Sequence, residues 1–454
     1  MPDTLLVILA VIFVLGIAIN IHEFGHFIVA KIFGMRVEAY SFFGLGPRIW
    51  GFKVGHTDYR VSAIPLGAYV KLYGDEATAP LEGGDSTGEK VPDEELYELR
   101  PRWQKFLVML GGPFMNILLA LAIPFGAAML YGVPSMPAPI VGAVRPGGAA
   151  ETSGIKVGDR IVQFAGVDNP TWGNIRDDSL ISPDSEVPVI VDRGGQRLSL
   201  TVKPAREVIE GNAVGDIGMV PDAGVEPVEV GSIEQGMPAA ESGLQVGDRV
   251  IAFNGKTVRN SQELGTQIRE NKDQPAKITV ERNGQLTEIQ TAAKLDSKGV
   301  YRIGIGFAAA SITTMEKVGI AQAAAYAVDS NLRIISLTGK VFGQMFSGQR
   351  SVKDAGLAGP VGIVSIIATV VREAGFAGLV MILGVISLNL GVFNLLPIPL
   401  LDGGQIMVLG IEKVMSWFGR TLSMAWKERI QLTGLAVILL LMVFTLFLDI
   451  SRFF

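Results

Sequence analysis

The sequence has 454 residues, of which 49% are hydrophobic and 18% are charged, whereas about 25% of a typical soluble domain is charged. This composition predicts a membrane protein with sizeable soluble parts, and the net charge of -5 provides no basic surface for nucleic acid. Because the chain contains no cysteine, disulfides, thiolate metal sites and cysteine nucleophiles are excluded, and a metal would have to bind His, Asp or Glu.

Four stretches are apolar and long enough to cross a bilayer, which needs about 20 helical residues. They cover approximately residues 5–30, 106–131, 376–400 and 431–448. No Lys or Arg precedes the first stretch, so it lacks the basic region of a signal peptide, and we expect it to be retained as a helix. Lys and Arg gather in residues 31–105 and 411–430, which predicts cytoplasmic positions for both segments and outward-facing termini.

The first stretch ends with HEFGH, which contains His22, Glu23 and His26. On a helix, residues four apart point about 40° from each other, so both histidines can bind one metal ion. This spacing is typical of zinc sites in which the adjacent glutamate accepts a proton from water. The alternative is a chance match on a buried helix, which the cost of ionisable groups within a membrane disfavours.

The next segment, residues 37–74, alternates apolar and polar side chains in short runs separated by Gly and Pro, which predicts strands. Open strand edges cannot face lipid, so we expect this cytoplasmic β element to pack beside the membrane helices. Residues 75–100 are acidic and rich in small residues, and we expect them to form a flexible loop.

Residues 141–166 and 230–255 form a repeat that is identical at 12 of 26 positions without a gap. Each copy continues into two strands joined by a glycine-containing turn, RGG or RNG, which predicts a β-hairpin. The shared SGxxVGDR signature resembles PDZ domains of bacterial envelope proteins. That resemblance implies a groove that adds a peptide as an extra strand, although the two modules would also fit a role as rigid spacers.

Residues 315–346 show helical periodicity, which predicts an amphipathic helix at the membrane interface, although core packing would give a similar pattern. LAGPVGI, at residues 357–363, is predicted to be a loop ahead of a short apolar segment. The sequence leaves open whether residues 361–371 enter the membrane.

A hydrolytic zinc site usually has three protein ligands, and Asp402 in the sequence PIPLLDGG is the strongest candidate for the third. It is a lone acid at the end of a long apolar run, and the adjacent Pro and Gly residues allow irregular backbone around an enclosed cavity. The alternative is that Asp402 only caps a helix. His56 lies in a polar loop and is expected to be an ordinary surface residue.

With HEFGH in the first apolar stretch, LDGG after the third and tandem PDZ-like modules between the second and third, the chain resembles the site-2 protease family of intramembrane zinc metalloproteases. The resemblance is strongest to members with tandem PDZ domains from Gram-negative inner membranes. It implies Zn²⁺ ligands at His22, His26 and Asp402, with Glu23 as the general base. It also implies a substrate site shaped by four residues: Asn389, Asn394, Pro397 and Pro399. Gln405 and Ala68 depart from the family pattern, which puts the details of substrate handling in doubt.

The resemblance implies hydrolysis of a peptide bond in or near the transmembrane segment of single-pass membrane proteins, of the anti-sigma factor type or remnant signal peptides. We expect the substrate helix to unwind and add as a strand to the β element around residues 64–70; alternatively, these strands only plug the site. One functional alternative is a PDZ-containing membrane adaptor with an inert or structural metal site. A zinc transporter is disfavoured, because no second set of intramembrane carboxylates is evident.

These inferences predict a multi-pass α-helical membrane protein of the bacterial inner membrane, with about four transmembrane helices, a membrane-associated β element and two periplasmic β-rich PDZ domains. Its partners are the lipid bilayer, single-pass substrates and peptide termini at the PDZ grooves, and its active site lies near the cytoplasmic side. The predicted domains are an N-terminal membrane core (1–131), two PDZ domains (132–215 and 216–300), a membrane-associated linker (301–375) and a C-terminal membrane core (376–454).

Overall fold

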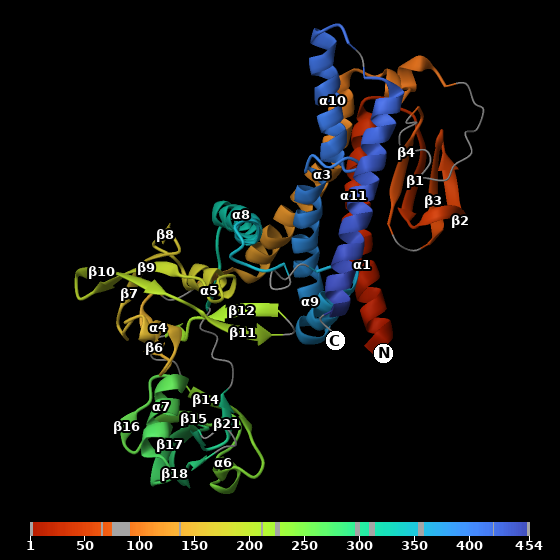
Figure 1. Ribbon diagram of the computed structural model, residues 1–454. Coiled ribbons are helices and arrows are strands. Elements are labelled where there is room, and N and C mark those ends of the chain that lie inside the picture. Colours follow the sequence, from red (N-terminus) through yellow and green to blue (C-terminus); the bar gives the residue numbers. More distant parts are fainter. Residues whose placement is uncertain are drawn as a thin grey trace. The chain divides into compact units, whose positions relative to one another are not determined.

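The computed structural model describes residues 3–451 except 65–66, 75–90, 136–137, 210–211, 223–227, 296–299, 308–313, 353–357 and 421. The chain divides into two compact units (Figure 1). Unit 1 comprises Met1–Val133 and Lys317–Phe454, and unit 2 comprises Pro134–Glu316. The predicted flexible loop lies mostly outside the described residues, and its last part forms two short 3₁₀ turns, Asp93–Glu95 and Tyr97–Leu99.

Unit 1 is built on long apolar helices, which satisfy most of their backbone groups internally, as a membrane requires. Its helices are α1 (Asp3–Ile32), α3 (Arg102–Tyr131), α8 (Ile320–Phe346), α9 (Pro360–Asn394), α10 (Asp402–Trp417) and α11 (Met424–Ser451). Helices α1, α3 and α9 pack against one another (Figure 1). In the described part of the chain, four helices are long and apolar enough to span a membrane, and they contain the four predicted stretches almost entirely.

The third predicted stretch had the wrong limits. Helix α9 begins at Pro360, so residues 360–363 are helical rather than part of a loop, because proline fits the first turn of a helix, where its N–H is not needed. The chain kinks at Gly375, whose φ of 59° glycine adopts without steric cost. The helix ends at Asn394 instead of residue 400, because Pro397 and Pro399 cannot continue it.

The predicted β element is a four-stranded sheet of β1 (Val37–Phe43), β2 (Leu45–Val54), β3 (Thr57–Ile64) and β4 (Tyr69–Leu72), in the order β2-β3-β1-β4. Strand β4 is therefore an edge strand, paired only with β1 among the described strands. The sheet is joined to α1 by Tyr40, whose hydroxyl donates to Asn20 Oδ1 at 2.8 Å. Burial raises the pKa of Tyr40, with a further increase from the Glu23 carboxyl, so this hydroxyl remains a donor.

Unit 2 contains two modules with the same element order and separate hydrophobic cores. The first contains β6 (Val141–Val144), β7 (Arg160–Phe164), α5 (Trp172–Leu180), β9 (Val187–Arg193), β10 (Gln196–Val202) and β13 (Met219–Pro221). The second contains β14 (Val228–Ile233), β15 (Arg249–Phe253), α7 (Ser261–Asn271), β17 (Pro275–Arg282), β18 (Gln285–Ala292) and β21 (Ile305–Phe307). Both predicted hairpins are present, as β9–β10 and β17–β18.

The last strand of each module pairs with its first: β13 with β6, and β21 with β14. The predicted divisions after residues 215 and 300 therefore fall before these closing strands. The aspartate of each VGDR sequence has an equivalent role, because Asp159 accepts a 2.7 Å hydrogen bond from Arg193, and Asp248 accepts one from Arg282. The predicted helix at residues 315–346 begins later, at Ile320, because Thr314–Glu316 forms a short strand, β22, with β5 (Val133–Ser135).

Candidate metal centre

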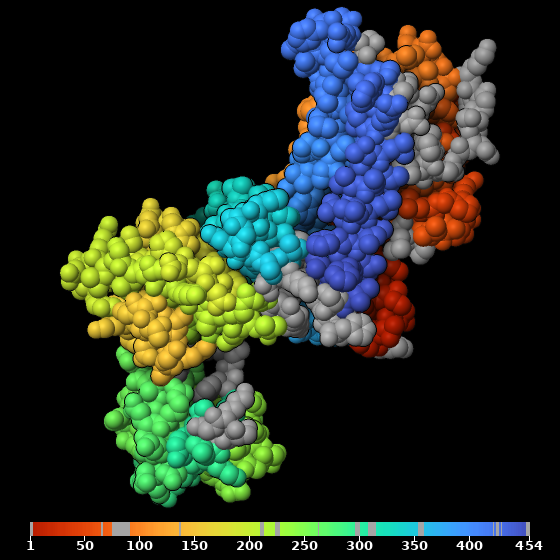
Figure 2. All heavy atoms as spheres, viewed as in Figure 1, coloured from red at the N-terminus to blue at the C-terminus, as the bar shows by residue number. Residues whose placement is uncertain are grey.

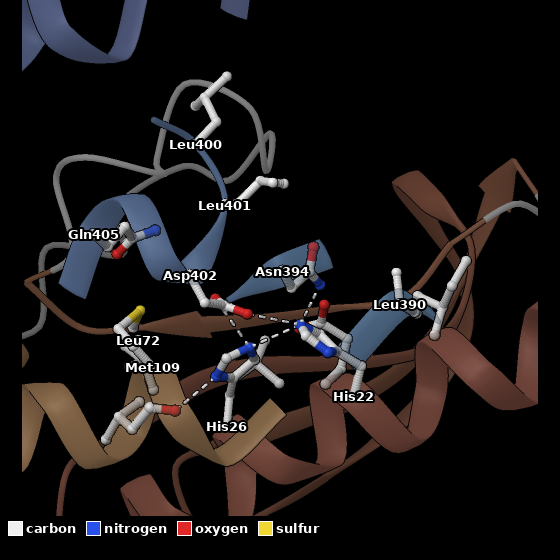
Figure 3. A pocket seen from close by; sticks show the side chains of 14 residues that line it. His22, His26, Leu72, Met109, Leu390, Asn394, Leu400, Leu401, Asp402 and Gln405 are labelled. Atoms are coloured by element: carbon white, nitrogen blue, oxygen red, sulfur yellow. Dashed lines mark hydrogen bonds and ion pairs between the residues drawn. The ribbon is translucent and has the colours of Figure 1, made fainter. Parts of the chain in front are cut away.

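Two helices supply three convergent side chains. His22 and His26 lie on the buried face of α1 and Asp402 is the first residue of α10 (Figure 3). His22 Nε2 lies 3.2 Å from His26 Nε2 and 3.1 Å from Asp402 Oδ2, and His26 Nε2 lies 3.4 Å from Asp402 Oδ1. The side chain of Asp402 makes no helix-capping hydrogen bond, and the cap position belongs to Leu401. The structure thus brings together the three predicted ligands.

The donor set fits zinc. Bonds of about 2.0–2.1 Å at tetrahedral angles place ligand atoms about 3.3 Å apart, close to the three separations above. Among the described residues, Asp402 Oδ2 is buried without a hydrogen-bond donor, which is costly for a carboxylate unless a cation faces it. Two imidazoles and one carboxylate also leave a fourth position open, as in hydrolytic zinc sites.

The carbonyl of Val108 on α3 orients His26. His26 Nδ1 lies 2.7 Å from Val108 O, so the ring donates its Nδ1 proton there and keeps the Nε2 lone pair for a metal. Val108 is a buried residue of α3. A backbone group of α3 thereby fixes the tautomer of one candidate ligand.

Asn116 on α3 orients the ring of His22 in the same way. Its Nδ2 lies 3.2 Å from His22 Nδ1, and Ser387 Oγ of α9 donates to its Oδ1 and its backbone carbonyl at 3.2 and 3.0 Å. A metal on Nε2 requires a proton on Nδ1, so metal binding requires the amide of Asn116 to be turned over, with its oxygen facing the ring. Its NH₂ group then faces Ser387 Oγ, whose own proton goes to the Asn116 carbonyl. Sequence reasoning missed both residues.

Substitution of Asn116 tests this support. Asn116→Leu keeps the approximate volume but leaves His22 Nδ1–H without an acceptor, and we expect zinc affinity to fall by about 10–100-fold. Competition with a chromogenic chelator measures the affinity. Asn331→Leu, a second buried asparagine replaced in the same way but distant from the ligands, is the matched control. An Asn116→Leu affinity equal to that of the control would contradict the assignment.

Glycines allow α3 to approach these ligands closely. A Cβ on Gly25 would collide with the backbone of Gly111, so the two helices pack backbone to backbone, as small residues permit in membranes. A Cβ on Gly112 would collide with His26 Nε2 and would lie 2.8 Å from His22 Nε2. Glycine at position 112 therefore keeps the space between the candidate ligands open.

The turn before Asp402 is folded against the start of α10. A Cβ on Gly403 would meet the carbonyl of Leu395, and one on Gly404 would meet that of Ile398, so the two glycines allow the turn to close over the helix end. Leu400 has a φ of 80°, a strained conformation for a residue with a side chain, of a kind that concentrates at functional sites. The irregular backbone expected around Asp402 is present here.

A cavity of about 310 Å³ surrounds the cluster. The described residues that line it include the three candidate ligands, Glu23, Val70, Asn394, Leu400 and Gln405. The backbone N–H of Val70, on the edge strand β4, donates to the Glu23 carboxylate. Asn394 Nδ2 lies 3.2 Å from His22 Nε2. The cavity thus combines a candidate metal site, a free carboxylate and an amide donor.

Three predicted substrate residues do not line this cavity in the described part of the chain. Asn389 lies in the last turns of α9, while Pro397 and Pro399 lie in the turn between α9 and α10. Pro399 instead contacts α11, where a Cβ on Gly434 would collide with its carbonyl. His56 lies in the turn between β2 and β3, outside the metal cluster, as expected.

Comparisons with known proteins identify the family. Residues 10–441 match the model of peptidase family M50. The chain is 30% identical over 466 residues to the protease RseP of Yersinia pestis, and the match covers 98% of each chain. It is 30% identical over 463 residues to the regulator of sigma-E protease RseP of Salmonella typhimurium, again over 98% of each chain.

Among solved structures, the PDZ domain of the SdrC-like protein from Listeria monocytogenes is 28% identical, with 18% of this chain and 86% of that chain covered and a TM-score of 0.17. The family match, by contrast, spans nearly the whole sequence and includes every candidate ligand. This chain therefore belongs to peptidase family M50 and is a zinc metalloendopeptidase of the site-2 protease type.

Proposed function

We propose that the protein hydrolyses a peptide bond in or near the transmembrane segment of single-pass membrane proteins, as a step of regulated intramembrane proteolysis in a bacterial inner membrane. The observation that carries this proposal is the convergence of His22, His26 and Asp402 with Glu23 in one cavity between apolar helices. A cavity of this kind lets water and a peptide bond meet away from lipid.

The two histidines and Asp402 hold the zinc ion. When bound, zinc lowers the pKa of a water molecule toward about 7 and polarises a carbonyl group. Glu23 lies in the same cavity without being one of the three converging ligands, so it is free to accept the proton of the water and return it to the leaving amine. The Val70 N–H holds the carboxylate of Glu23 in place.

Asn394 holds the substrate backbone. Its Nδ2 lies beside the metal cluster, 3.2 Å from His22 Nε2, and the residue lines the cavity, where its amide can donate to a substrate carbonyl or accept from a substrate N–H. Asn389, Pro397 and Pro399 shape the substrate site indirectly. The prolines end α9 directly after Asn394 and set the path of the turn that leads to Asp402.

A helical substrate must unwind before its peptide bonds can react, and β4 offers a place for the unwound chain. One edge of this strand pairs with no other described strand, and Val70 and Leu72 of the strand line the cavity. An extended substrate segment added beside β4 would place its backbone next to Glu23, with main-chain hydrogen bonds providing affinity. This edge of β4 and its position beside the candidate metal site support this arrangement.

Proline substitution tests strand addition. Val70→Pro removes the N–H that bonds the Glu23 carboxylate and distorts the edge of β4 on which the substrate strand would lie. We expect turnover of a transmembrane substrate to fall by about tenfold, with zinc content unchanged. Because Val70 also supports Glu23, a short unstructured peptide is assayed in parallel. An equal loss for both substrates would count against strand addition.

The control for this variant is Ile49→Pro on the opposite edge of the same sheet. Ile49 lies at a register shift in the β2–β3 pairing, between Arg48 and Trp50, and bulges at sheet edges tolerate proline. We expect this variant to cleave both substrates like the wild type.

Anti-sigma factors and remnant signal peptides are the proposed substrate classes. We further propose that the two modules of unit 2 are PDZ domains on the periplasmic side, where they bind peptide termini or exclude substrates with intact outer domains. The five predicted domains are retained in this proposal, with β13 and β21 assigned to the modules that they close.

The test of the proposed function is cleavage of a shortened single-pass substrate by the purified chain in detergent. We expect cleavage to stop when a chelator removes zinc and to return in proportion to the zinc added back. If the zinc-loaded protein cleaves none of several shortened substrates, the site is structural and the protein is better explained as a PDZ-containing membrane adaptor.

A further inference from the structure

Pro124, within α3, leaves one backbone carbonyl in unit 1 without its helical hydrogen bond. Proline has no backbone N–H, so the carbonyl of Ala120, four residues earlier, loses its partner in the helix. Ala120 is 1% exposed, and an unpaired carbonyl in an apolar environment costs several kcal/mol. Some other donor must therefore reach this carbonyl.

Asn331 on α8 provides that donor. Its Nδ2 lies 3.0 Å from Ala120 O and 2.8 Å from Ala327 O of its own helix, so both amide protons are used. Asn331 is 7% exposed and continues a buried stripe of α8 that also contains Ala323 and Ala327. Small residues in this stripe let the backbones of α8 and α3 approach, and the asparagine adds one polar link between them.

Much of the remaining surface of α8, the cyan segment of Figure 2, is exposed. Its large exposed apolar side chains include Val328, Leu332 and Phe346. Within the buried stripe of α8, Asn331 provides the hydrogen bond to the backbone of α3.

The far half of α8 contacts the end of α9 that precedes Asn394. About 16 Å along the helix from Asn331, the ring of Phe342 packs edge-on against Phe393 with centroids 6.4 Å apart. Phe393 immediately precedes Asn394, whose amide lies 3.2 Å from His22 Nε2. Helix α8 thus contacts both the Pro124 turn of α3 and the end of α9 that carries Asn394.

We propose that Asn331 is a positioning residue that pins α8 to α3 at the carbonyl left open by Pro124, and that α8 thereby holds Asn394 against the metal site through Phe342 and Phe393. The proposal rests on the proposed function of Asn394 as the holder of the substrate backbone. It explains the proline and the asparagine together, because each is costly in an apolar environment without the other.

A double-mutant cycle tests whether Asn331 fixes α8 to α3. Asn331→Leu leaves Ala120 O buried without a donor, and we expect KM for a shortened single-pass substrate to rise about threefold, the typical size of a hydrogen bond between membrane helices, with zinc content unchanged. Adding Pro124→Ala restores the helical N–H and removes the unpaired carbonyl, but it does not rebuild the link between α8 and α3. The double variant should therefore regain thermal stability while its KM stays about threefold raised, and a double variant whose KM returns to the wild-type value overturns the proposal.

A second measurement needs neither substrate nor zinc. The chain has no cysteine, so Phe342→Cys and Phe393→Cys introduce the only two thiols, and a short bismaleimide reports how often α8 and α9 meet. We expect Asn331→Leu to slow this crosslinking, and adding Pro124→Ala should leave it slow because the link between α8 and α3 is still missing. Ser336→Leu, at an exposed position of the same helix, is the control and should change nothing.

The two readouts separate the possible failures. Unchanged crosslinking in Asn331→Leu overturns the pin itself, and slowed crosslinking with an unchanged KM overturns its link to Asn394. A wild-type protein that cleaves no substrate refutes the proposed function, while the crosslinking rates still decide whether Asn331 pins α8.

Discussion

Replacement of Glu23 by glutamine is expected to reduce turnover by about 1,000-fold while leaving the zinc content unchanged. The carboxylate lies in the cavity beside the metal cluster, but it is not one of the three converging ligands. Glutamine has almost the same shape and cannot accept a proton, so it removes general-base catalysis, which is typically worth 10²–10⁴-fold. Single-turnover cleavage of a shortened substrate and elemental analysis of zinc measure the two effects separately.

Two further variants serve as controls for the Glu23→Gln result. Asp402→Ala removes a ligand and should lose zinc together with activity, in contrast to Glu23→Gln. Glu373→Gln, an exposed acid on α9, makes the same chemical change away from the cavity and should cleave like the wild type. If Glu23→Gln kept a tenth or more of wild-type turnover, another group would have to be the base.

The candidate catalytic and metal-binding residues were visible in the sequence because polar groups are rare in its apolar stretches. His22, Glu23 and Asp402 stand out there, and the structure places all three in one cavity. The β element and the hairpins were also predictable, since alternation and turns such as Asn283–Gly284, both with positive φ, are local signals.

Features that depend on tertiary contacts were not visible. A glycine such as Gly112 or an asparagine such as Asn116 has no distinctive local pattern within a helix, and its role arises only when α3 packs on α1. Pro360 was interpreted as part of a loop, yet it begins α9, because a proline is compatible with a break and with a first helical turn.

Among these hidden residues, Gly112 should show the largest effect. Gly112→Ala adds one methyl group that would collide with His26 Nε2 and lie 2.8 Å from His22 Nε2, so it occupies the space where the candidate ligands converge. We expect zinc affinity to fall by at least about 100-fold, at the upper end of what changes around metal ligands cause, and turnover to fall with it. Chelator competition and the cleavage assay measure the two losses.

Gly126→Ala is the matched control for this variant. It makes the same change on the same helix, and a Cβ there meets no atom within 4 Å among the described residues. Alanine favours a helix over glycine by about 1 kcal/mol at either position, so helix propensity alone would make both variants more stable. A loss of zinc in Gly112→Ala but not in Gly126→Ala must then come from the contact with the histidines. Retention of zinc by both variants would show that α3 can move away from α1, and the close approach at Gly112 would not be required for the metal site.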